Sequence, residues 1–231
     1  MYIINPNCGL CNRLRCLISY CHYAESINSD LTVLWQNSKD CPGIYLDYYE
    51  PLPNVNFVTS IKPGVKIDYI GNYWHPDFNP YLADGKLGFY DKLKLKSYME
   101  NIVSDKINKL GKNYISVHIR RTDHVILAKS KSKYTTDDDF IEFIDKHDSN
   151  SNIYIATDNL ETYNKFKKLY PDRIKFDYHK EENKNVKKCE RTTSLQDAII
   201  DLHMCISSVE FKGSGFSSFS GLISCVRKSQ S

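Results

Sequence analysis

The first part of the chain combines short apolar runs with one helical pattern. Apolar runs at residues 2–4 and 31–35 predict two buried strands, and the segment between them, about 12–27, predicts a helix. Its apolar residues recur at the i, i+3, i+4, i+7 spacing that places them on one core-facing stripe. The residues of this stripe are Leu14, Leu17, Ile18, Cys21 and Ala24. The pattern therefore predicts a β-α-β unit.

Between residues 36 and 85 the pattern is weaker, because prolines interrupt short apolar pieces. We expect strands at 55–58 and 65–70, joined by long loops. A charged amphipathic helix is predicted over about 92–110, ending at Gly111, because glycine commonly terminates helices in the left-handed conformation. We expect the domain junction here, so that the two domains are residues 1–111 and 112–231.

The second half shows a regular alternation of apolar runs and helical patterns. Strands are predicted at 114–119, 153–156, 174–176 and 209–212, and helices at about 136–145, 160–169, 194–206 and 216–227. Four strand-helix pairs in succession predict an α/β fold with a doubly wound parallel sheet. Ser194 is suited to cap the third of these helices, because its side-chain oxygen can accept a backbone N–H two or three residues on.

Composition narrows the possible functions. With 41% hydrophobic and 26% charged residues, the 231-residue chain is typical of a globular protein, and a net charge of +3 is too small to indicate a nucleic-acid partner. No apolar run approaches the ~18 residues that cross a bilayer, and the first residues lack a signal peptide's apolar core. Eight cysteines are too few for a disulfide scaffold. We therefore expect a cytoplasmic protein with reduced thiols and no membrane span.

Polar and glycine residues gather after three of the predicted strands. They are His118, Arg120, Arg121 and Asp123 after the first, Thr157, Asp158 and Asn159 after the second, and Gly213, Ser214, Gly215, Ser217 and Ser218 after the last. The carboxyl ends of parallel strands lie at one edge of a sheet, where ligands bind. The planar arginine fork suits phosphate oxygens, and a glycine bend before a helix lets the backbone approach an anion. The clustering predicts a phosphate-binding cleft.

Each of these groups also has a simpler explanation. The Arg-Asp pair can be a surface salt bridge, the bend at 213–215 an ordinary turn, and Asp158 a helix cap. The bend is not a GxGxxG fingerprint and lacks the Gly-Lys-Ser/Thr ending of a triphosphate loop, which argues against an ATPase. Asp201 lies mid-helix among apolar neighbours, so it needs either an exposed helix face or a partner such as a ligand.

A second glycine-containing turn stands at the start of the first helix, where Cys8 and Cys11 flank Gly9. The Cys-x-x-Cys spacing is compatible with a redox dithiol, because a helix start lowers a thiol pKa. Half of a zinc site is a second explanation, but the remaining cysteines offer no second close pair. A ligand-facing or merely structural turn is the third.

Taken together, these segments resemble the fucosyltransferases that form α1,2, α1,6 and protein O-linked fucose bonds, including the nodulation fucosyltransferases of rhizobia. Residues 118–123 are similar to the family's His-x-Arg-Arg-x-Asp motif, and residues 153–158 to its second motif. Residues 197–203 with 216–218 resemble its third motif, and residues 9–15 its amino-terminal Gly-x-x-Asn element.

This resemblance implies a GT-B-like fold of two Rossmann-like domains, with an acceptor-side domain at 1–111 and a GDP-fucose-binding domain at 112–231. It implies that Arg120 holds the β-phosphate during catalysis. The donor pocket that it implies, together with the strand-end residues, is His118, Arg121, Asp123, Thr157, Asp158, Asp201, Gly215, Ser217 and Ser218. The acceptor-side residues are Gly9, Asn12 and Arg13.

The family transfers fucose to a glycan hydroxyl with inversion and without an essential metal, so the resemblance implies no metal and no cofactor. The sequence agrees, because it has no Asp-x-Asp at a strand end. Residues 137–139 contain that spacing, but they stand at a predicted helix start, where acidic residues favour the helix dipole.

The sequence also departs from the family pattern. The α1,6 motif continues with Lys and then a catalytic Glu, whereas His124 and Ala128 stand here, and Phe219 replaces a Gln. The general base is thus unassigned, and His124 is a hypothetical catalytic acid/base because imidazole titrates near neutral pH. Three other functions stay open: a non-catalytic nucleotide-sugar or glycan-binding module, a thiol oxidoreductase through Cys8 and Cys11, and a glycosyltransferase that uses another donor.

Overall fold

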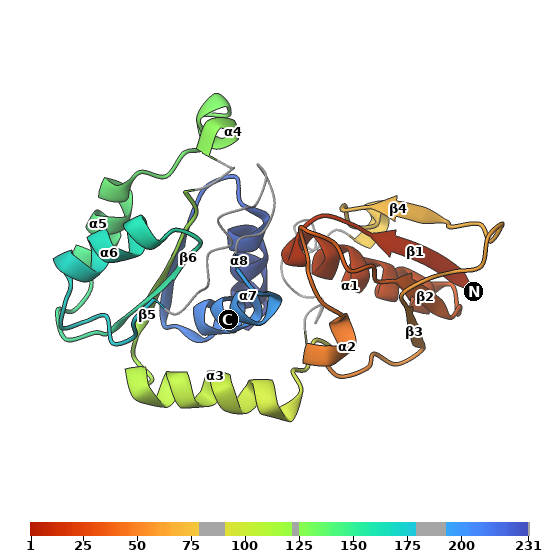
Figure 1. The fold of residues 1–231 in the computed structure, drawn as a ribbon, viewed down its shortest axis with the longest axis horizontal. Coiled ribbons are helices and arrows are strands. Elements are labelled where there is room, and N and C mark those ends of the chain that lie inside the picture. Colours follow the sequence, from red (N-terminus) through yellow and green to blue (C-terminus); the bar gives the residue numbers. More distant parts are fainter. Residues whose placement is uncertain (79–90, 122–124, 179–192, 231) are drawn as a thin grey trace. The chain divides into compact units, whose positions relative to one another are not determined.

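The computed structural model describes residues 1–78, 91–121, 125–178 and 193–230 (Figure 1). Contacts between residues divide the chain into two compact units, which are called unit 1 (Met1–Met99 with Cys225–Ser231) and unit 2 (Glu100–Ser224). Each unit contains its own parallel sheet, so the predicted α/β class is confirmed. Within the described ranges, no helix combines the length and the apolar character needed to cross a bilayer.

Unit 1 is built on a four-stranded parallel sheet in the order β3-β2-β1-β4. β1 (Tyr2–Pro6) and β2 (Leu31–Leu34) are joined by α1 (Leu10–Ser26), which confirms the predicted β-α-β unit. β3 (Val55–Val58) pairs with β2, and β4 (Tyr69–Gly71) pairs with β1 on its other side. The first two strands therefore lie inside the sheet and the last two form its edges.

The apolar stripe predicted for α1 belongs to the core of unit 1. All residues of that stripe are buried. The fourth strand, predicted at 65–70, begins only at Tyr69, although Asp68 already binds Ile3 through its amide at 2.9 Å and its carboxylate at 2.8 Å. Two short helices that the sequence analysis does not predict, α2 (Tyr45–Tyr48) and η1 (Pro76–Phe78), lie in the proline-rich stretch.

α3 (Ser97–Leu110) ends where the sequence predicts, at Gly111, which has φ +78° in the left-handed region. From Glu100 onward, the residues of α3 belong to unit 2. The Asn152 side chain donates to the Leu110 carbonyl at 2.6 Å, and Lys106 lies 4.5 Å from the centre of the Phe176 ring. The division by contacts therefore falls near the start of this helix, whereas the predicted junction follows its end.

Unit 2 contains a three-stranded parallel sheet in the order β6-β5-β7 among the residues described. β5 (Ile115–Ile119) is central, with β6 (Ile153–Thr157) on one side and β7 (Glu210–Gly213) on the other. Every residue of β5 and β6 is buried, as expected for parallel strands covered on both faces.

Helices cover both faces of this sheet (Figure 1). α5 (Asp137–Asp145) and α6 (Leu160–Leu169) pack on one face, where their aromatic and aliphatic side chains join those of β5 and β6 in one core. α7 (Leu195–Ser207) and the first part of α8 (Ser218–Gln230) pack on the opposite face. That face is partly polar: the hydroxyl of Tyr114 donates to the Met204 carbonyl at 2.6 Å.

Three helices of unit 2, α5, α6 and α7, begin at side-chain caps. Ser194 accepts from the Asp197 amide, which confirms the predicted cap of α7, and Thr136 forms a capping box with Asp139 at α5. α6 is capped by Asn159, so the explanation of Asp158 as the helix cap is wrong. α4 (Val125–Ser130) is a further short helix that the sequence analysis does not predict.

The strand predicted at 174–176 is wrong, because these described residues form no strand. The side chains of α6 bind the carbonyls that a strand would offer to a neighbour: Lys167 donates to Ile174 and Tyr163 to Phe176. The segment nevertheless lies beside β6, since the Ile153 amide donates to the Arg173 carbonyl at 2.9 Å. The apolar residues of this segment thus pack beside the sheet, but the segment is not one of its strands.

Candidate functional site

A single hydroxyl joins the carboxyl ends of β5 and β7. Ser214 Oγ accepts a hydrogen bond from the Arg120 amide at 2.9 Å and donates to the His118 carbonyl at 3.0 Å. The Ser214 amide donates to the same carbonyl at 2.9 Å. The backbone of the arginine motif and the glycine-serine bend, which are far apart in sequence, are therefore held together.

A small pocket opens where these strand ends meet. The residues that line it are Arg120, Arg121, Val125, Ala128, Tyr134, Thr135, Ser214 and Gly215. It is the place where the first predicted strand end, the loop before α5 and the glycine-serine bend come together. Ala128, at the position of the family's catalytic Glu, is buried and supplies no carboxylate.

Gly215 is required by the protein's own packing. A side chain at this position would collide with the Lys133 carbonyl oxygen, and the Gly215 amide donates to Thr135 Oγ1 at 2.8 Å. The amide is therefore bound to the protein itself. A contact of Gly215 with the donor stays a prediction.

The first turn of α8 follows the bend directly. Ser217 caps it, accepting from the Ser220 amide at 3.4 Å through its side chain and from the Gly221 amide at 2.9 Å through its carbonyl. The amides of Ser218 and Phe219 stand in the first turn, where helix geometry provides no acceptor, and the helix dipole there favours an anion. The preceding Phe216 has φ +57°, an unusual conformation for a bulky residue.

His118 connects β5 to the same helix. It is buried, its Nδ1 lies 2.8 Å from Ser220 Oγ in a hydrogen bond, and its ring centre lies 4.6 Å from that of Phe219. The phenylalanine that departs from the family pattern thus packs against the histidine of the first motif. Both contacts fix α8 against β5, the strand that directly precedes Arg120.

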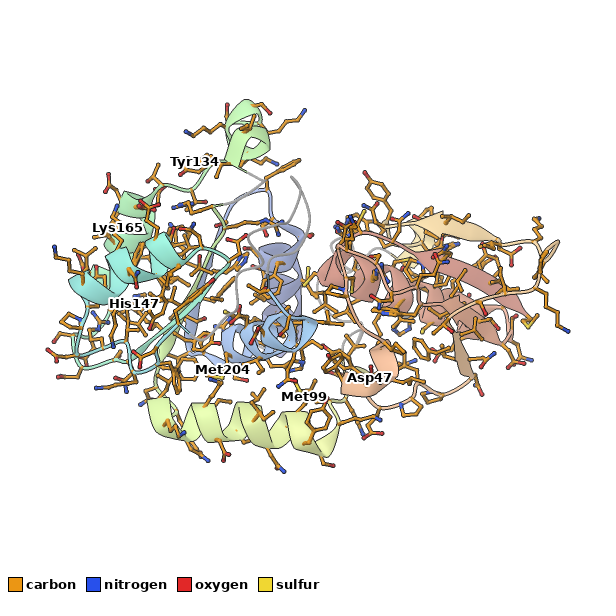
Figure 2. The ribbon with its side chains drawn as sticks, in the orientation of Figure 1. Asp47, Met99, Tyr134, His147, Lys165 and Met204 are labelled. Carbon is orange, nitrogen blue, oxygen red and sulfur yellow. The ribbon has the colours of Figure 1, made fainter. Side chains whose placement is uncertain are left out.

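Arg121 is held by α5. Its Nη2 and Nε both donate to Asp137 Oδ1, at 2.5 and 3.2 Å, and its guanidinium lies 5.2 Å from the Tyr134 ring and 5.6 Å from the Phe140 ring. Asp137 Oδ2 accepts from Lys165 at 2.6 Å. Figure 2 labels Tyr134 ahead of α5 and Lys165 on α6. A direct contact of Arg121 with the donor stays a prediction.

These partners change the acidity of Asp137. Burial alone would raise the pKa of its carboxyl, but the hydrogen bonds from Lys165 and Arg121 and their positive charges outweigh burial and hold the pKa below its usual value. Residues 137–139 stand at a helix start, as predicted, but the ion pair is not predicted from the sequence. The only sequence feature that indicates the Arg121–Asp137 pair is a carboxylate at the start of the helix predicted after the arginine motif.

The end of β6 lies against the arginine motif. Thr157 Oγ1 donates to the Ile119 carbonyl at 2.7 Å, and Asp158 Oδ1 accepts from the Arg121 amide at 3.3 Å. Thr157 and Asp158 are therefore placed beside the residues with which the sequence groups them. Residues at the ends of β6 and β7 thus both bind the backbone at the end of β5.

Asp201 is buried and has a partner. The hydroxyl of Tyr154, on β6, donates to Asp201 Oδ1 at 2.8 Å. Burial, and then the nearby carboxylate, raise the pKa of Tyr154 well above its usual value, so the phenol keeps its proton. Both residues line a pocket beside β6 that is open to solvent. Asp197, Phe176 and Lys106 are among the other lining residues.

In unit 1, the amino-terminal motif (residues 9–15) connects two loops through Arg13. Gly9 stands at the start of α1 and its carbonyl accepts from the Asn12 amide at 3.0 Å. Arg13 is 2% exposed and its three guanidinium nitrogens donate to the Cys8 carbonyl, the Gln36 carbonyl and Ser38 Oγ at 2.6–2.8 Å. Arg13 therefore holds two loops together, and its contact with a sugar stays a prediction.

Cys8 and Cys11 are not joined in a disulfide. Cys11 is buried, and Cys8, with φ +64°, has its sulfur 3.2 Å from the Asn72 side-chain nitrogen. Among the residues described, no three His, Cys, Asp or Glu side chains gather as metal ligands would. Asp123 and His124, the remaining predicted site residues, lie outside the described ranges.

Comparisons with known proteins identify the fold. No protein-family model matches the sequence, and no curated protein matches it significantly. Solved structures do match over nearly the whole chain. NodZ α-1,6-fucosyltransferase soaked with GDP-fucose is 12% identical with a TM-score of 0.64, covering 97% of this chain and 92% of that chain.

Fucosyltransferase NodZ from Bradyrhizobium is 13% identical with a TM-score of 0.63, covering 96% of this chain and 91% of its own. POFUT1 in complex with GDP-fucose is 12% identical with a TM-score of 0.60, covering 98% and 94%. The resemblance found in the motifs is therefore matched by the backbone. The chain has the fold of the fucosyltransferases NodZ and POFUT1.

Proposed function

We propose that this protein is a glycosyltransferase that moves L-fucose from GDP-fucose to a glycan hydroxyl, with inversion and without an essential metal. The observation that carries the proposal is the Ser214 hydroxyl, which fixes the Arg120 backbone to the bend that precedes α8. Solved structures with this fold include proteins in complex with GDP-fucose, which supports the donor. We further propose a reducing, cytoplasmic location, because the cysteines among the described residues form no disulfide.

In this proposal, the diphosphate of the donor lies between Arg120 and the first turn of α8. The arginine supplies a delocalised positive charge, and the amides of Ser218 and Phe219 supply donors at the positive end of the helix dipole. Negative charge grows on the leaving diphosphate as the bond to fucose breaks. Fixed donors aimed at that charge lower the barrier without having to reorganise.

The nucleobase is proposed to occupy the pocket beside β6. Guanine offers N–H donors at N1 and N2, and Asp201 and Asp197 offer carboxylates in that pocket, whereas adenine has an acceptor at N1. The tyrosine that binds Asp201 keeps the carboxylate in one orientation. This arrangement favours a guanine nucleotide over an adenine nucleotide.

The acid/base group stays a hypothesis that rests on the sequence. His124 follows the motif directly, and imidazole titrates near neutral pH. We expect the pH-rate profile of transfer to change in the His124→Gln variant. An unchanged profile would remove this residue from consideration.

Thermal-shift measurements with GDP, UDP, ADP and dTDP test the donor. GDP alone is expected to raise the melting temperature strongly, because a ligand at 100 times its Kd adds about 2.7 kcal/mol of stability. Equal shifts with all four nucleotides would contradict the base pocket. Release of GDP from GDP-fucose, with and without a panel of glycans, then tests the transfer.

A second function has one observation in its favour. The buried Ala128 lines the arginine pocket where the related enzymes carry a catalytic Glu, so a non-catalytic nucleotide-sugar-binding module is the alternative. That module would bind GDP and GDP-fucose but would neither transfer fucose nor hydrolyse the donor. The assay with GDP-fucose separates the two functions.

A further inference from the structure

Unit 1 contains a second pocket, at the carboxyl ends of β2 and β3. Its lining residues are Trp35, Ile44, Leu46, Phe57, Val58, Thr59 and Ser60. Its cavity volume is about 420 Å³, within the range of roughly 300–1,000 Å³ that small-molecule sites occupy. Trp35 directly follows β2, and Thr59 directly follows β3, so the pocket lies at the edge where parallel sheets bind ligands.

The wall of this pocket is built from aromatic rings that hold one another. The Tyr45 ring stacks on the Phe57 ring at a centre distance of 4.3 Å and an angle of 5°, and it lies 5.4 Å from the Trp35 ring. Tyr49 stacks on the other side of this cluster, 5.0 Å from Tyr45. The half-buried Phe57 lines the pocket and is therefore supported from behind. Such a wall is formed before any ligand arrives.

Two polar atoms in this wall have no hydrogen-bond partner. Trp35 Nε1 and the Tyr45 hydroxyl are buried without a partner among the residues that the structure describes. Buried indole N–H and phenol groups usually find one, because an unpaired buried donor is costly. At the exposed rim, Thr59 and Ser60 add two hydroxyls. The pocket itself thus combines the aromatic surface of Trp35 and Phe57 with the rim hydroxyls of Thr59 and Ser60, a combination suited to a hydroxylated ligand.

The amino-terminal motif supports the same wall. The Arg13 guanidinium lies 5.3 Å from the Trp35 ring centre and donates to the Gln36 carbonyl and to Ser38, in the loop that follows β2. The motif that resembles the family's acceptor-side element is therefore in contact with a residue of the pocket. This contact links the motif to the pocket through the protein's own structure.

We propose that this pocket binds a sugar ring of the acceptor glycan, an inference that rests on the proposed function. A pyranose has an apolar C–H face that packs on aromatic rings, and hydroxyls at its edge that bind polar groups. No charged side chain is among the described residues that line the pocket, so an anionic ligand such as a nucleotide finds no counter-charge there. A neutral, hydroxylated ring fits both features.

The indole N–H of Trp35 provides a direct test. The chain has two tryptophans, so a Trp74→Phe variant leaves Trp35 as the source of one indole resonance in a nitrogen-proton NMR spectrum. Neutral β-methyl glycosides of glucose, galactose, mannose and N-acetylglucosamine are titrated to roughly 50 mM, well above the millimolar Kd expected for one sugar ring. A saturable shift of this resonance with at least one glycoside is expected. The absence of such a shift with all four overturns the proposal.

A rim variant locates the binding. Ser60 is exposed, so Ser60→Phe should leave the fold intact while its ring fills the mouth of the pocket. We expect the glycoside Kd and the KM for the acceptor to rise by about tenfold or more, with unchanged GDP binding. The matched control is Ser26→Phe, at an exposed serine at the end of α1. Glycoside binding as tight in the Ser60 variant as in the control also overturns the proposal.

The same titration separates this inference from the proposed function. A glycoside shift in a protein that does not bind GDP supports the sugar site and refutes the donor assignment. GDP binding without any glycoside shift overturns the sugar site and leaves the donor assignment in place.

Discussion

At the residue scale, the candidate site depends on side chains that position other side chains. Ser214, His118 and Asp137 each bind a backbone or side-chain group of the arginine motif or of α8. The sequence predicts which residues gather at the strand ends, because strand ends follow from apolar runs. It does not predict the Arg121–Asp137 pair, because that contact depends on how α5 returns to the sheet.

Arg120 is expected to be essential for turnover. Under the proposed function, replacing it with Ala removes the positive charge that would face the leaving diphosphate, so kcat should fall by at least about 10²–10³-fold. The Arg120→Ala variant should fold normally, because the backbone amide that binds Ser214 is retained. Lys168→Ala, an exposed cation on α6, is the matched control for charge. Near-normal transfer by the Arg120 variant would refute the assignment.

Asp137→Asn should lower the free energy of unfolding by an amount that depends on pH. The folded pKa of Asp137 lies below its ordinary value of 3.8, so its stabilising contribution is present above that value and is lost as the pH falls through the folded pKa. The wild type should exceed the variant by less than about 1 kcal/mol at neutral pH, because partly exposed ion pairs are weak. The difference should vanish in strong acid.

Urea unfolding of both proteins across this pH range measures the effect. A difference that is constant with pH would show that the carboxylate charge is not the cause. Transfer assays on the same variant report whether Arg121 must be held by α5 for activity.

At the element scale, the strands and helices follow the apolar pattern closely, and the failures have local causes. The run at 174–176 is apolar because it covers β6, yet side chains of α6 bind its carbonyls. α4 is short and its pattern is too brief to predict a helix. The Gly213–Gly215 bend is a turn, as its composition predicts, but the packing that requires Gly215 comes from residues about 80 positions earlier.

Gly215→Ala is expected to destabilise this joint. The added methyl group would displace the Lys133 carbonyl and disturb the hydrogen bond to Thr135, at a cost of about 1–3 kcal/mol. Gly9→Ala is the matched control, since its new methyl group would meet the nearest atom, the Asp40 carbonyl oxygen, at an ordinary 3.8 Å. Denaturant unfolding of the two variants compares the effects. Equal stabilities would contradict the close packing at Gly215.

At the scale of the whole molecule, the fold is shared with proteins whose sequences differ at most positions. Identity to the solved fucosyltransferases is 12–13%, yet the backbone matches over nearly the whole chain. The motifs carry the resemblance because a ligand site constrains residue types at strand ends, as the predicted phosphate site would, whereas core positions accept many apolar residues. The proline-rich part of unit 1 has few such constraints, so its aromatic pocket could not be predicted from the sequence.

Amide hydrogen exchange should give two separate footprints. GDP is expected to slow exchange near Arg120 and at the start of α8, because ordered contacts reduce local opening. A bound glycoside should instead slow exchange around Trp35 and Phe57, in unit 1. If GDP protected the residues of the aromatic pocket and not those of α8, the proposed placement of the donor would be wrong.

The two proposed contacts with the donor come from different helices: the carboxylates of the base pocket stand on α7, and the phosphate-facing amides on α8. Nucleotide preference can therefore be redesigned, or can drift in evolution, by changing Asp197 and Asp201 alone. The leaving-group chemistry would be inherited unaltered. A family with this layout is free to diversify its sugar nucleotides without rebuilding the part that breaks the glycosidic bond.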